Sequence, residues 1–391
     1  MIEREITAVF RKAVKTHPVV TVFGPRQSGK TTLVRHVLPN YGYANLENPK
    51  ERRLAIEDPE AFFALHPSPL IVDEVQRVPE LLSWIQVRVD ESRKMGEYVL
   101  TGSHQPQLKE KVSQSLAGRT ALVTLLPFSL SELVSAGYLL SRDEAIYRGF
   151  LPRIYSDGLE PTIAYEEYYR TYVERDVRQL VQVENQSAFE TFVRLLAGRV
   201  GQVVNFQSLS DDVGVDAKTL KRWMSVLEAS YIVIHLQPYY RNFGKRLVKS
   251  PKIYFTDVGL AAYLLGITQA SQVVRDPLFG GLFENLVVVD LMKTKLNWQL
   301  RQDFYYIRDN SGIEVDLVLE QNRKLNLLEI KGAMTPDNSF GLNMERIRKC
   351  TDDVLTCNVV YSGETWPLKG GGRFVNFHDA AKLMKGLGTV S

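Results

Sequence analysis

One segment of the chain combines glycine, lysine and hydroxyl residues at a spacing suited to holding phosphate groups. The sequence GPRQSGKT, from Gly24 to Thr31, fits the pattern G-x-x-x-x-G-K-[ST]. Gly24 and Gly29 permit a tight turn that points backbone amides at phosphate oxygens, and Lys30 would reach the β- and γ-phosphates. The Thr31 hydroxyl would bind Mg²⁺. We therefore predict that ATP with Mg²⁺ is bound by Gly24, Pro25, Arg26, Gln27, Ser28, Gly29, Lys30, Thr31 and Thr32.

The residues on either side place this loop in the context that the motif requires. The apolar run from Val19 to Phe23 precedes the loop and predicts a strand, and Leu33, Val34, Val37 and Leu38 follow it at helical spacing. In this order the N-terminus of the helix adds its partial positive charge to the phosphate site. The context disfavours the alternative of a purely structural glycine turn.

A pair of carboxylates follows a second apolar run. Residues Leu70 to Val72 predict a strand, and Asp73 and Glu74 come directly after them. We predict that Asp73 holds the Mg²⁺ ion, usually through water, and that Glu74 orients or deprotonates the attacking water. An Asp-Glu pair after a strand is common by itself. It indicates a nucleotide site here because it occurs together with the phosphate loop.

Two further polar positions could act on the γ-phosphate. The next predicted strand, YVLTGSH, ends in Thr101 and Ser103, and we predict a sensor role for a hydroxyl there, with Ser103 as the candidate. The alternative is a turn former. Arg119 is the candidate for neutralising transition-state charge, either in its own chain or in a neighbour. A surface arginine without a catalytic role is the alternative reading.

The elements expected around these residues give an α/β fold. In residues 1–162, apolar runs alternate with helical patterns around the phosphate loop, which predicts a P-loop domain with a mostly parallel sheet and helices on its faces. Residues 163–204 are densely charged and predict a helical bridge whose solvated face is laced with ion pairs. Residues 205–272 predict two helices and two strands, as in a winged helix, and residues 273–391 predict a second α/β core.

Composition limits the class of protein. The chain has 391 residues, of which 45% are apolar and 24% charged, and its net charge is +3, which favours a soluble protein of two or three domains. Cys350 and Cys357 are too far apart for a CxxC pair, and the six histidines show no zinc-ligand spacing. The charged N-terminal segment and the lack of a long apolar run predict a cytoplasmic protein without membrane spans.

A basic stretch in the winged-helix segment predicts a nucleic-acid surface. Five cations lie between Tyr240 and Ile253 without an acidic residue, and the preceding helix carries three more. That helix could enter a DNA groove while the basic loop grips phosphates. Protein binding and a merely solvated loop are the alternatives. The candidate DNA contacts are Lys218, Lys221, Arg222, Arg241, Lys245, Arg246, Lys249 and Lys252.

Several longer segments, spread over nearly the whole chain, carry a family resemblance. They are GPRQSGKTTL, LIVDEVQRVPEL, VLTGSHQPQL, SLAGRTALVTLLPFSLSEL, YRTYVERDVRQL, SPKIYFTDVGLAAYLLG, FENLVVVDLM, IEVDLVLE and LLEIKG. Together they resemble prokaryotic AAA-type ATPases with a C-terminal domain of unknown function. The resemblance implies an AAA-like ATPase module, a winged-helix segment and an end domain related to the restriction-endonuclease fold. For a second arginine sensor of the AAA type, the candidates are Arg148 and Arg153.

Acidic residues near the C-terminus suggest a second reaction centre. Glu284 on a predicted helix, Asp316 after a strand, and Glu329 with Lys331 on the next strand follow the PD-(D/E)xK nuclease arrangement. Asp316 and Glu329 would hold a divalent metal, and Lys331 would position the nucleophile. The order of elements is more specific than the tripeptide alone, which also occurs at Asp216. Solvated charges at strand ends are the alternative.

Three functions follow as hypotheses. The first is Mg²⁺-dependent ATP hydrolysis that drives a conformational change coupled to DNA. The second is a nucleotide-gated switch with slow hydrolysis, which binds a protein partner or a second copy of the chain. The third is a metal-dependent nuclease controlled by ATP. Stimulation of ATP turnover by DNA would separate the first hypothesis from the second.

Overall fold

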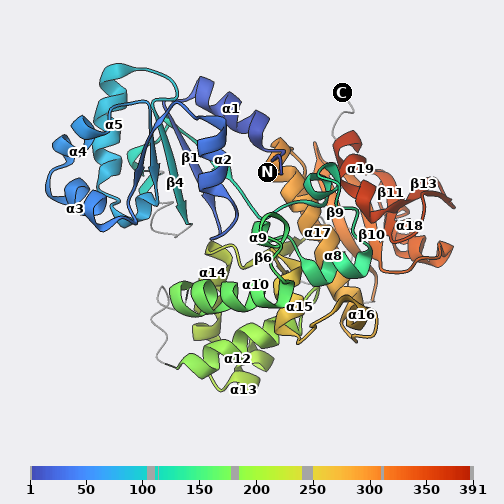
Figure 1. Ribbon diagram of the computed structural model, residues 1–391. Helices are drawn as coiled ribbons and strands as arrows, with labels where there is room; N and C mark the ends of the chain where they lie inside the picture. The colour runs from blue at the N-terminus through green and yellow to red at the C-terminus, as the bar shows by residue number, and fades with distance from the viewer. Residues whose placement is uncertain are drawn as a thin grey trace. The chain divides into compact units, whose positions relative to one another are not determined.

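The computed structural model describes residues 2–103, 111–112, 114–177, 185–239, 250–309 and 312–387. Contacts within the chain separate two compact units. The first unit contains Met1–Phe128, Ala229–Tyr231 and Leu296–Gln299, and the second contains Ser129–Glu228, Ile232–Lys295 and Leu300–Ser391. Each unit has a sheet of its own (Figure 1), so the predicted α/β fold with a second α/β core is confirmed.

The first unit alternates strands with helices, as its apolar runs predicted. Its five-stranded sheet is parallel throughout and has the order β2-β3-β4-β1-β5. The elements are α1 (Thr7–Thr16), β1 (Val19–Gly24), α2 (Lys30–Val37), β2 (Gly42–Asn45), α3 (Pro49–Glu57), α4 (Pro59–Leu65), β3 (Leu70–Asp73), the short 3₁₀ turn η1 (Val75–Arg77), α5 (Leu81–Ser92), β4 (Tyr98–Ser103) and β5 (Thr120–Thr124).

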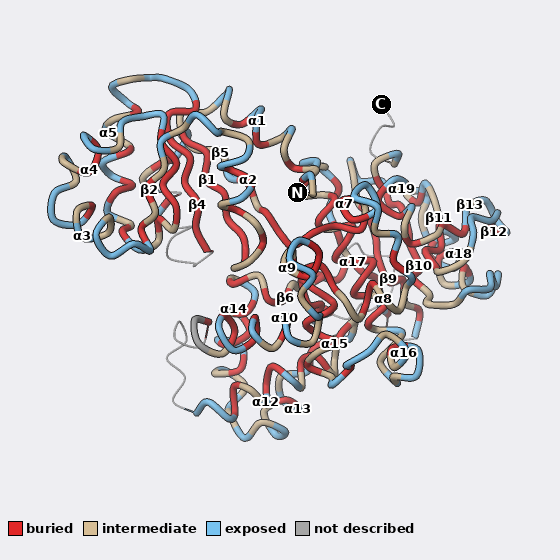
Figure 2. Tube along the Cα trace, viewed as in Figure 1, coloured by how far each residue is buried: buried red, intermediate tan, exposed pale blue. Residues whose placement is uncertain are grey.

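Side chains on the two faces of this sheet form two hydrophobic clusters. Strand β1 alternates between them: Val19 and Phe23 belong to the cluster that includes residues of α4 and α5, whereas Val20 and Val22 belong to the cluster that includes residues of α1 and α2. All β1 residues are buried, and Figure 2 shows the central strands in red between more exposed helices. The sheet is therefore covered on both sides, as a parallel sheet requires.

The carboxyl ends of three neighbouring strands meet at one edge of this sheet. Strand β1 ends at Gly24, β3 at Asp73 and β4 at Ser103. Gly24 and Ser103 face each other in the β1–β4 register. Ligands of open α/β sheets bind at this edge, so the fold places the predicted phosphate loop where a ligand is expected.

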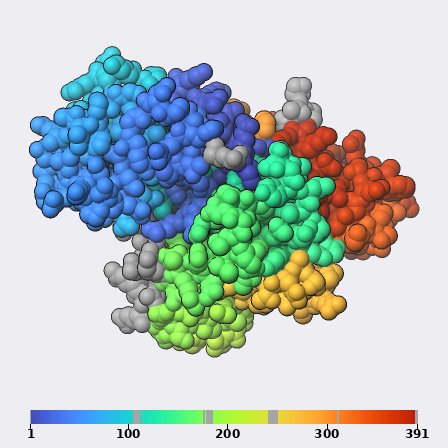
Figure 3. All heavy atoms as spheres, in the orientation of Figure 1, coloured from blue at the N-terminus to red at the C-terminus, as the bar shows by residue number. Residues whose placement is uncertain are grey.

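The second unit begins with a helical region. Figure 3 shows green residues of this region on the surface of the molecule. Its elements are α7 (Leu130–Ser135), α8 (Arg142–Arg148), α9 (Pro152–Ser156), α10 (Pro161–Tyr168), the π-helical stretch η2 (Tyr169–Val177), α12 (Gln186–Ala197), α13 (Phe206–Val213) and α14 (Ala217–Ala229).

The charged segment after residue 162 lies within this helical region and is only partly solvated, which corrects its interpretation as a solvated face. Tyr165, Tyr168 and Tyr172 are buried because they recur at helical spacing and form one apolar face. The ion pair between Arg170 and Glu166, at 3.0 Å, lies on exposed side chains. The tyrosines at helical spacing within this charged run therefore mark the face of the helix that is buried.

A mixed eight-stranded sheet forms the rest of the second unit. Its order is β12-β13-β11-β10-β9-β8-β6-β7, with parallel pairs β10–β11, β11–β13 and β6–β8. The elements are β6 (Val233–Pro238), β7 (Lys252–Phe255), α15 (Val258–Leu264), α16 (Ala270–Val273), α17 (Phe279–Trp298), β8 (Asp303–Arg308), β9 (Glu314–Gln321), β10 (Lys324–Lys331), η3 (Asn338–Gly341), α18 (Leu342–Arg348), β11 (Val354–Tyr361), β12 (Trp366–Leu368), β13 (Gly372–Asn376), η4 (Phe377–Asp379) and α19 (Ala380–Leu387).

Candidate functional site

The loop between β1 and α2 is shaped by backbone geometry that its glycines allow. A Cβ atom at Gly24 would lie 2.0 Å from the Leu125 carbonyl oxygen, so this position has no room for a side chain. Gly29 adopts φ +90°, in the region that favours glycine, immediately before α2 begins at Lys30. The first amides of α2 therefore point out of the helix end with no side-chain cap from Gly29. This is the backbone arrangement that binds phosphate.

Lys30 is folded into the loop it belongs to. Its Nζ donates to the carbonyl oxygens of Gly24, at 3.1 Å, and of Pro25, at 2.8 Å. The side chain is buried, and this burial lowers the pKa of Lys30 to about 8, against the opposing effect of Glu74 and Asp73. A buried ammonium bonded only to neutral carbonyls is well suited to receive an anionic ligand.

Arg4 supports the same loop and was not predicted from the sequence. Its guanidinium donates to the Ser28 carbonyl at 2.8 Å and to the Leu126 carbonyl at 2.6 Å, and it stacks on the Phe128 ring at 4.8 Å. Arg4 is buried. It therefore ties the loop to the chain after β5 through contacts that are distant in sequence.

Asp73 sits at the centre of a set of hydroxyl groups. Thr31 Oγ1 donates to Asp73 Oδ2 at 2.9 Å, Tyr43 Oη donates to the same oxygen at 2.7 Å, and Thr101 Oγ1 donates to Asp73 Oδ1. The contact between Asp73 and Thr31 joins the two residues predicted to hold Mg²⁺. Tyr43 was not predicted, because its strand, β2, carries no motif. Burial, followed by the hydrogen bond to Asp73, raises the pKa of the Tyr43 phenol.

Glu74 follows Asp73 in a left-handed backbone conformation, with φ 58° and ψ 44°. This conformation turns the chain sharply after β3, and the Glu74 carboxylate accepts a hydrogen bond from Gln76. Burial raises the pKa of Glu74, while the nearby Lys30 ammonium opposes the rise. A carboxylate with a raised pKa is a stronger base, which suits the predicted role of Glu74.

Ser103 and Thr101 differ in their partners. The Thr101 hydroxyl is bonded to Asp73, whereas Ser103 Oγ is buried and has no hydrogen-bond partner among the residues that the structure describes. Ser103 faces Gly24 across the β1–β4 ladder. A buried hydroxyl without a partner costs free energy, so its position beside the loop fits a ligand oxygen that would bond to it.

Arg119 lies at the opposite edge of the sheet from this site. Its carbonyl accepts from the Val19 amide at the amino end of β1, whereas the loop starts at the carboxyl end, about 17 Å along the strand. The guanidinium pairs with Asp90 at 2.5 Å and 2.7 Å. This placement corrects the interpretation that Arg119 contacts the nucleotide bound by its own chain. A contact with a neighbouring chain stays a prediction.

A cavity of about 520 Å³ adjoins the phosphate loop. It lies beside Thr31 and Tyr43, and its volume is within the range of small-molecule sites. The residues that line it are Thr31, Thr32, Arg35, His36, Leu38, Pro39, Tyr41, Tyr43 and Ile71.

The predicted residues of the C-terminal centre also come together. Lys331 Nζ lies 2.6 Å from Glu329 Oε1 and 3.3 Å from Asp316 Oδ2, and Glu284 of α17 contacts the same group of residues through Lys252. Burial raises the pKa of Glu284 to about 7 and that of Glu329 to about 8.

The contacts of this group bear on the predicted metal site at Asp316 and Glu329, which stays a prediction. The ammonium groups of Lys252 and Lys331 lie against the carboxylates. Among the described residues, no group of three or more histidine, cysteine, aspartate or glutamate side chains is arranged to hold a metal ion.

The predicted DNA contacts fall into three groups. Lys218, Lys221 and Arg222 are exposed on α14. Lys252 is 1% exposed and paired with carboxylates, so the prediction that it binds DNA phosphates is wrong. The remaining candidates lie outside the described residues: Arg241, Lys245, Arg246 and Lys249. Of the two further arginine candidates, Arg153 pairs with Asp157 and Glu167.

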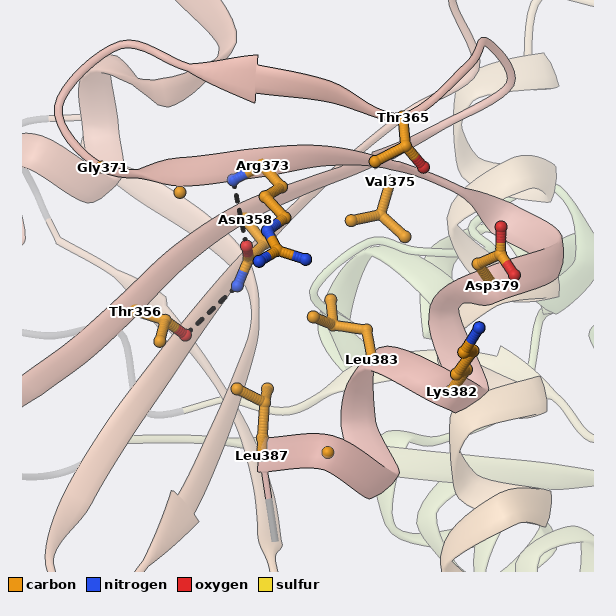
Figure 4. Close-up of a pocket in the computed structure, with 12 residues that line it drawn as sticks. Thr356, Asn358, Thr365, Gly371, Arg373, Val375, Asp379, Lys382, Leu383 and Leu387 are labelled. Atoms are coloured by element: carbon orange, nitrogen blue, oxygen red, sulfur yellow. Dashed lines mark hydrogen bonds between the residues drawn. The ribbon is translucent and has the colours of Figure 1, made fainter. Parts of the chain in front are cut away.

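A separate cavity of about 620 Å³ lies in the second unit (Figure 4). The side chains of Leu383 and Leu387 border it, and a hydrogen-bonded row of Thr356, Asn358 and the Arg373 amide forms its wall. The cavity contains none of the residues predicted to bind ATP, metal or DNA. No helix among the described residues is long and apolar enough to cross a membrane.

The parallel sheet, the glycine loop that opens α2 and the Asp73 carboxylate at the next strand end define a P-loop domain. In agreement, residues 16–134 match the family model described as AAA domain, so the first unit is a P-loop ATPase domain of the AAA class. Residues 140–271 and 279–377 match two domains of unknown function, DUF8612 and DUF4143.

Two mycobacterial proteins are similar in sequence to most of this chain. The chain is 33% identical over 367 residues to the uncharacterized protein Rv2008c of Mycobacterium tuberculosis and, to the same extent, to Mb2031c of Mycobacterium bovis. The match covers 92% of this chain and 80% of each relative. The chain therefore belongs to the same family as these two uncharacterized proteins.

Solved structures show weaker similarity. The Walker-type ATPase PABY2304 of Pyrococcus abyssi has 14% identity and a TM-score of 0.42, and the match covers 68% of this chain and 96% of that chain. DnaA of Aquifex aeolicus, bound to AMPPCP, has 14% identity and a TM-score of 0.30, with coverage of 57% and 85%. At these scores neither structure identifies a function for this chain.

Proposed function

We propose that the first unit binds ATP together with Mg²⁺ and hydrolyses the terminal phosphate bond. The observation that carries the proposal is the hydrogen bond between Thr31 and Asp73, at 2.9 Å, beside the buried ammonium of Lys30. Thr31 and Asp73 would hold the ion, Asp73 through water. When bound, Mg²⁺ would neutralise charge on the β- and γ-phosphates.

The other residues have separate tasks in this proposal. Lys30 exchanges its two carbonyl partners for phosphate oxygens, because its ammonium is already directed into the loop. Ser103 donates its unpaired hydroxyl to the γ-phosphate or to the attacking water. Glu74 accepts a proton from that water, and its raised pKa supports this role.

Phosphate release by the Glu74→Gln chain tests the hydrolytic part. The amide cannot accept the proton, so we expect normal ATP binding and a turnover reduced by a factor of about 10² to 10⁴. Glu80→Gln serves as the matched control because Glu80 is an exposed carboxylate shortly after Glu74 in the chain. Equal turnover in the parent and Glu74→Gln chains would refute the role of Glu74.

We further propose that ATP turnover is coupled to DNA through α14. Three cations, Lys218, Lys221 and Arg222, are exposed on this helix, and α13, α14, β6 and β7 follow one another in the order of a winged helix. The Lys221 ammonium lies 5.8 Å from the centre of the Phe206 ring, which leaves it at the surface of the helix pair. Such a helix would present positive charge to phosphates.

A charge reversal tests this coupling. DNA should raise the ATP turnover of the parent chain. The triple variant Lys218→Glu, Lys221→Glu and Arg222→Glu should bind DNA more weakly. The slope of the logarithm of its DNA-binding constant against the logarithm of salt concentration should be smaller in magnitude by up to about 3. Reversal of three other exposed cations of the second unit, Arg346, Lys349 and Lys382, is the matched control. If neither DNA nor the α14 reversal changes turnover, the result favours a nucleotide-gated protein switch.

A further inference from the structure

A lysine from a different strand lies within the carboxylate cluster of the second unit. We define this cluster as Glu284, Glu314, Asp316 and Glu329. The Nζ atom of Lys252, the first residue of β7, lies 2.8 Å from Glu284 Oε1, 2.6 Å from Glu314 Oε1 and 3.7 Å from Asp316 Oδ1. Three carboxylates from α17 and β9 therefore surround one ammonium group.

Lys252 is almost completely buried in this position. Its side chain is 1% exposed, although lysine normally keeps its ammonium in water. The ring of Tyr306 lies beneath the ammonium, with its centre 5.5 Å away. A group this buried is retained only because the carboxylates compensate for its lost hydration. The ammonium is thus a fixed part of the cluster.

Two of the carboxylates around Lys252 have further partners. Asp316 Oδ2 accepts from the Ile330 amide at 2.9 Å and from Lys331 at 3.3 Å, while Oδ1 faces Lys252. Glu284 Oε1 also accepts from the Tyr254 hydroxyl at 2.6 Å. These donors fix the carboxylates around ammonium groups at 2.6 to 3.7 Å, whereas Mg²⁺ needs oxygens at about 2.0 to 2.1 Å.

A divalent ion and the Lys252 ammonium would compete for the same place. Both are cations, and both need the inward-facing oxygens of Glu284, Glu314 and Asp316. With Lys252 buried among these oxygens, an incoming ion would meet a positive charge at contact distance in a medium that screens it poorly. The ammonium supplies charge balance, but it lacks the Lewis acidity that activates water.

We propose that the Lys252 ammonium replaces a divalent metal ion in the carboxylate cluster, so that the second unit is built without metal there. In this arrangement Asp316, Glu329 and Lys331 do not perform metal-assisted hydrolysis of phosphodiesters. The cluster instead joins β7 to α17 and β9. Glu329 Oε2 is buried and has no hydrogen-bond partner among the described residues.

The proposal predicts that removal of the ammonium opens a cation site. Without Lys252, the oxygens of Glu284, Glu314 and Asp316 would face each other, with Glu329 Oε2 available nearby. Binding of Mn²⁺ to the nucleotide-free full chain, followed by electron paramagnetic resonance, is the direct measurement, because free Mn²⁺ gives a signal that is lost on binding. Without nucleotide, the phosphate loop does not contribute a complete Mg²⁺ or Mn²⁺ site.

We expect no Mn²⁺ binding at this cluster in the parent chain and one new site in Lys252→Ala. At about 100 times the dissociation constant, Mn²⁺ should raise the melting temperature of Lys252→Ala by roughly 5 to 10 °C. Adding Asp316→Asn should abolish the new site. Lys252→Arg, which keeps the charge, and Lys324→Ala, which removes an exposed lysine paired with Asp353, should bind no Mn²⁺.

Two results would overturn the proposal. One is Mn²⁺ binding by the parent chain that Asp316→Asn removes, because it would show that Lys252 does not exclude metal. The other is a folded Lys252→Ala chain that gains no Mn²⁺ site. If Lys252→Ala does not fold, the parent chain is compared with its Asp316→Asn variant. Mn²⁺ binding by the parent that is lost in Asp316→Asn refutes the proposal. Absence of Mn²⁺ binding in both chains supports it.

Discussion

Replacement of Thr101 by valine should lower the stability of the chain. Replacement of Ser103 by alanine should lower ATP turnover and leave the stability unchanged or slightly higher. Both hydroxyls are buried at the end of β4, but among the described residues only the Thr101 hydroxyl has hydrogen-bond partners, which include the carboxylate of Asp73. Sequence reasoning could not distinguish them, because both are polar residues at the same strand end. The structure assigns one to the support of Asp73 and leaves the other free for a ligand.

The size of each effect follows from these contacts. A hydrogen bond to a charged group contributes about 1.5 to 3 kcal/mol, so Thr101→Val should lower the melting temperature by about 3 to 12 °C. Ser103→Ala removes a buried hydroxyl without a partner, so its nucleotide-free chain should be as stable as the parent or slightly more stable. If Ser103 donates to a phosphate oxygen, its loss should reduce turnover by about 10- to 150-fold.

Calorimetry of the nucleotide-free chains and phosphate release at saturating ATP measure the two effects separately. We expect Thr101→Val to lose stability, and Ser103→Ala to lose turnover while it keeps its stability. The reasoning is wrong if Ser103→Ala melts as far below the parent as Thr101→Val and hydrolyses ATP at the parent rate. Thr101→Ser, which retains the hydroxyl, is the control for the change in side-chain volume.

Two further predictions concern charged residues. The pKa of Lys30 is lowered from 10.5 to about 8, so the folded chain holds fewer protons than the unfolded chain between these values and its stability should rise by about 3 kcal/mol across pH 8 to 10.5. In Lys30→Met this rise should be absent, as urea unfolding at several pH values would show. Arg119→Ala should leave turnover unchanged, since Arg119 pairs with Asp90 away from the site. A large loss of turnover that depends on protein concentration would place Arg119 in a neighbouring chain's site.

The sequence predicted the features of the first unit that are local. Apolar runs located strands β1, β3 and β4, and the motif located the loop, because strand, turn and helix signals lie within a few residues of one another. Arg4 and Tyr43 could not be predicted this way. Their partners, Ser28 and Asp73, are separated from them by 24 and 30 positions, and only the folded sheet brings them together.

In the second unit, the sequence predicted which acidic residues meet in the fold. It did not predict that the Lys252 ammonium lies buried among them. Glu284, Asp316, Glu329 and Lys331 meet as their order of elements predicted. Lys252 was predicted to contact DNA phosphates because it ends a run of cations, but the pairing of β7 with β6 carries it into the interior. The run of basic residues therefore gave no indication that Lys252, its last member, pairs with Glu284 and Glu314.

Equilibrium binding of ATP in the presence of Mg²⁺ tests the central claim most directly. Calorimetric titration of the parent chain should show one saturable site, and Lys30→Met should lose at least about tenfold in affinity, since a charge-assisted contact with phosphate contributes 1.5 kcal/mol or more. Lys30→Met removes a buried charge and should stay folded, and Lys12→Met, at an exposed lysine of α1, should bind as the parent does. Equal affinity in the parent and Lys30→Met chains would contradict the assignment of the loop from Gly24 to Thr31 as the nucleotide site.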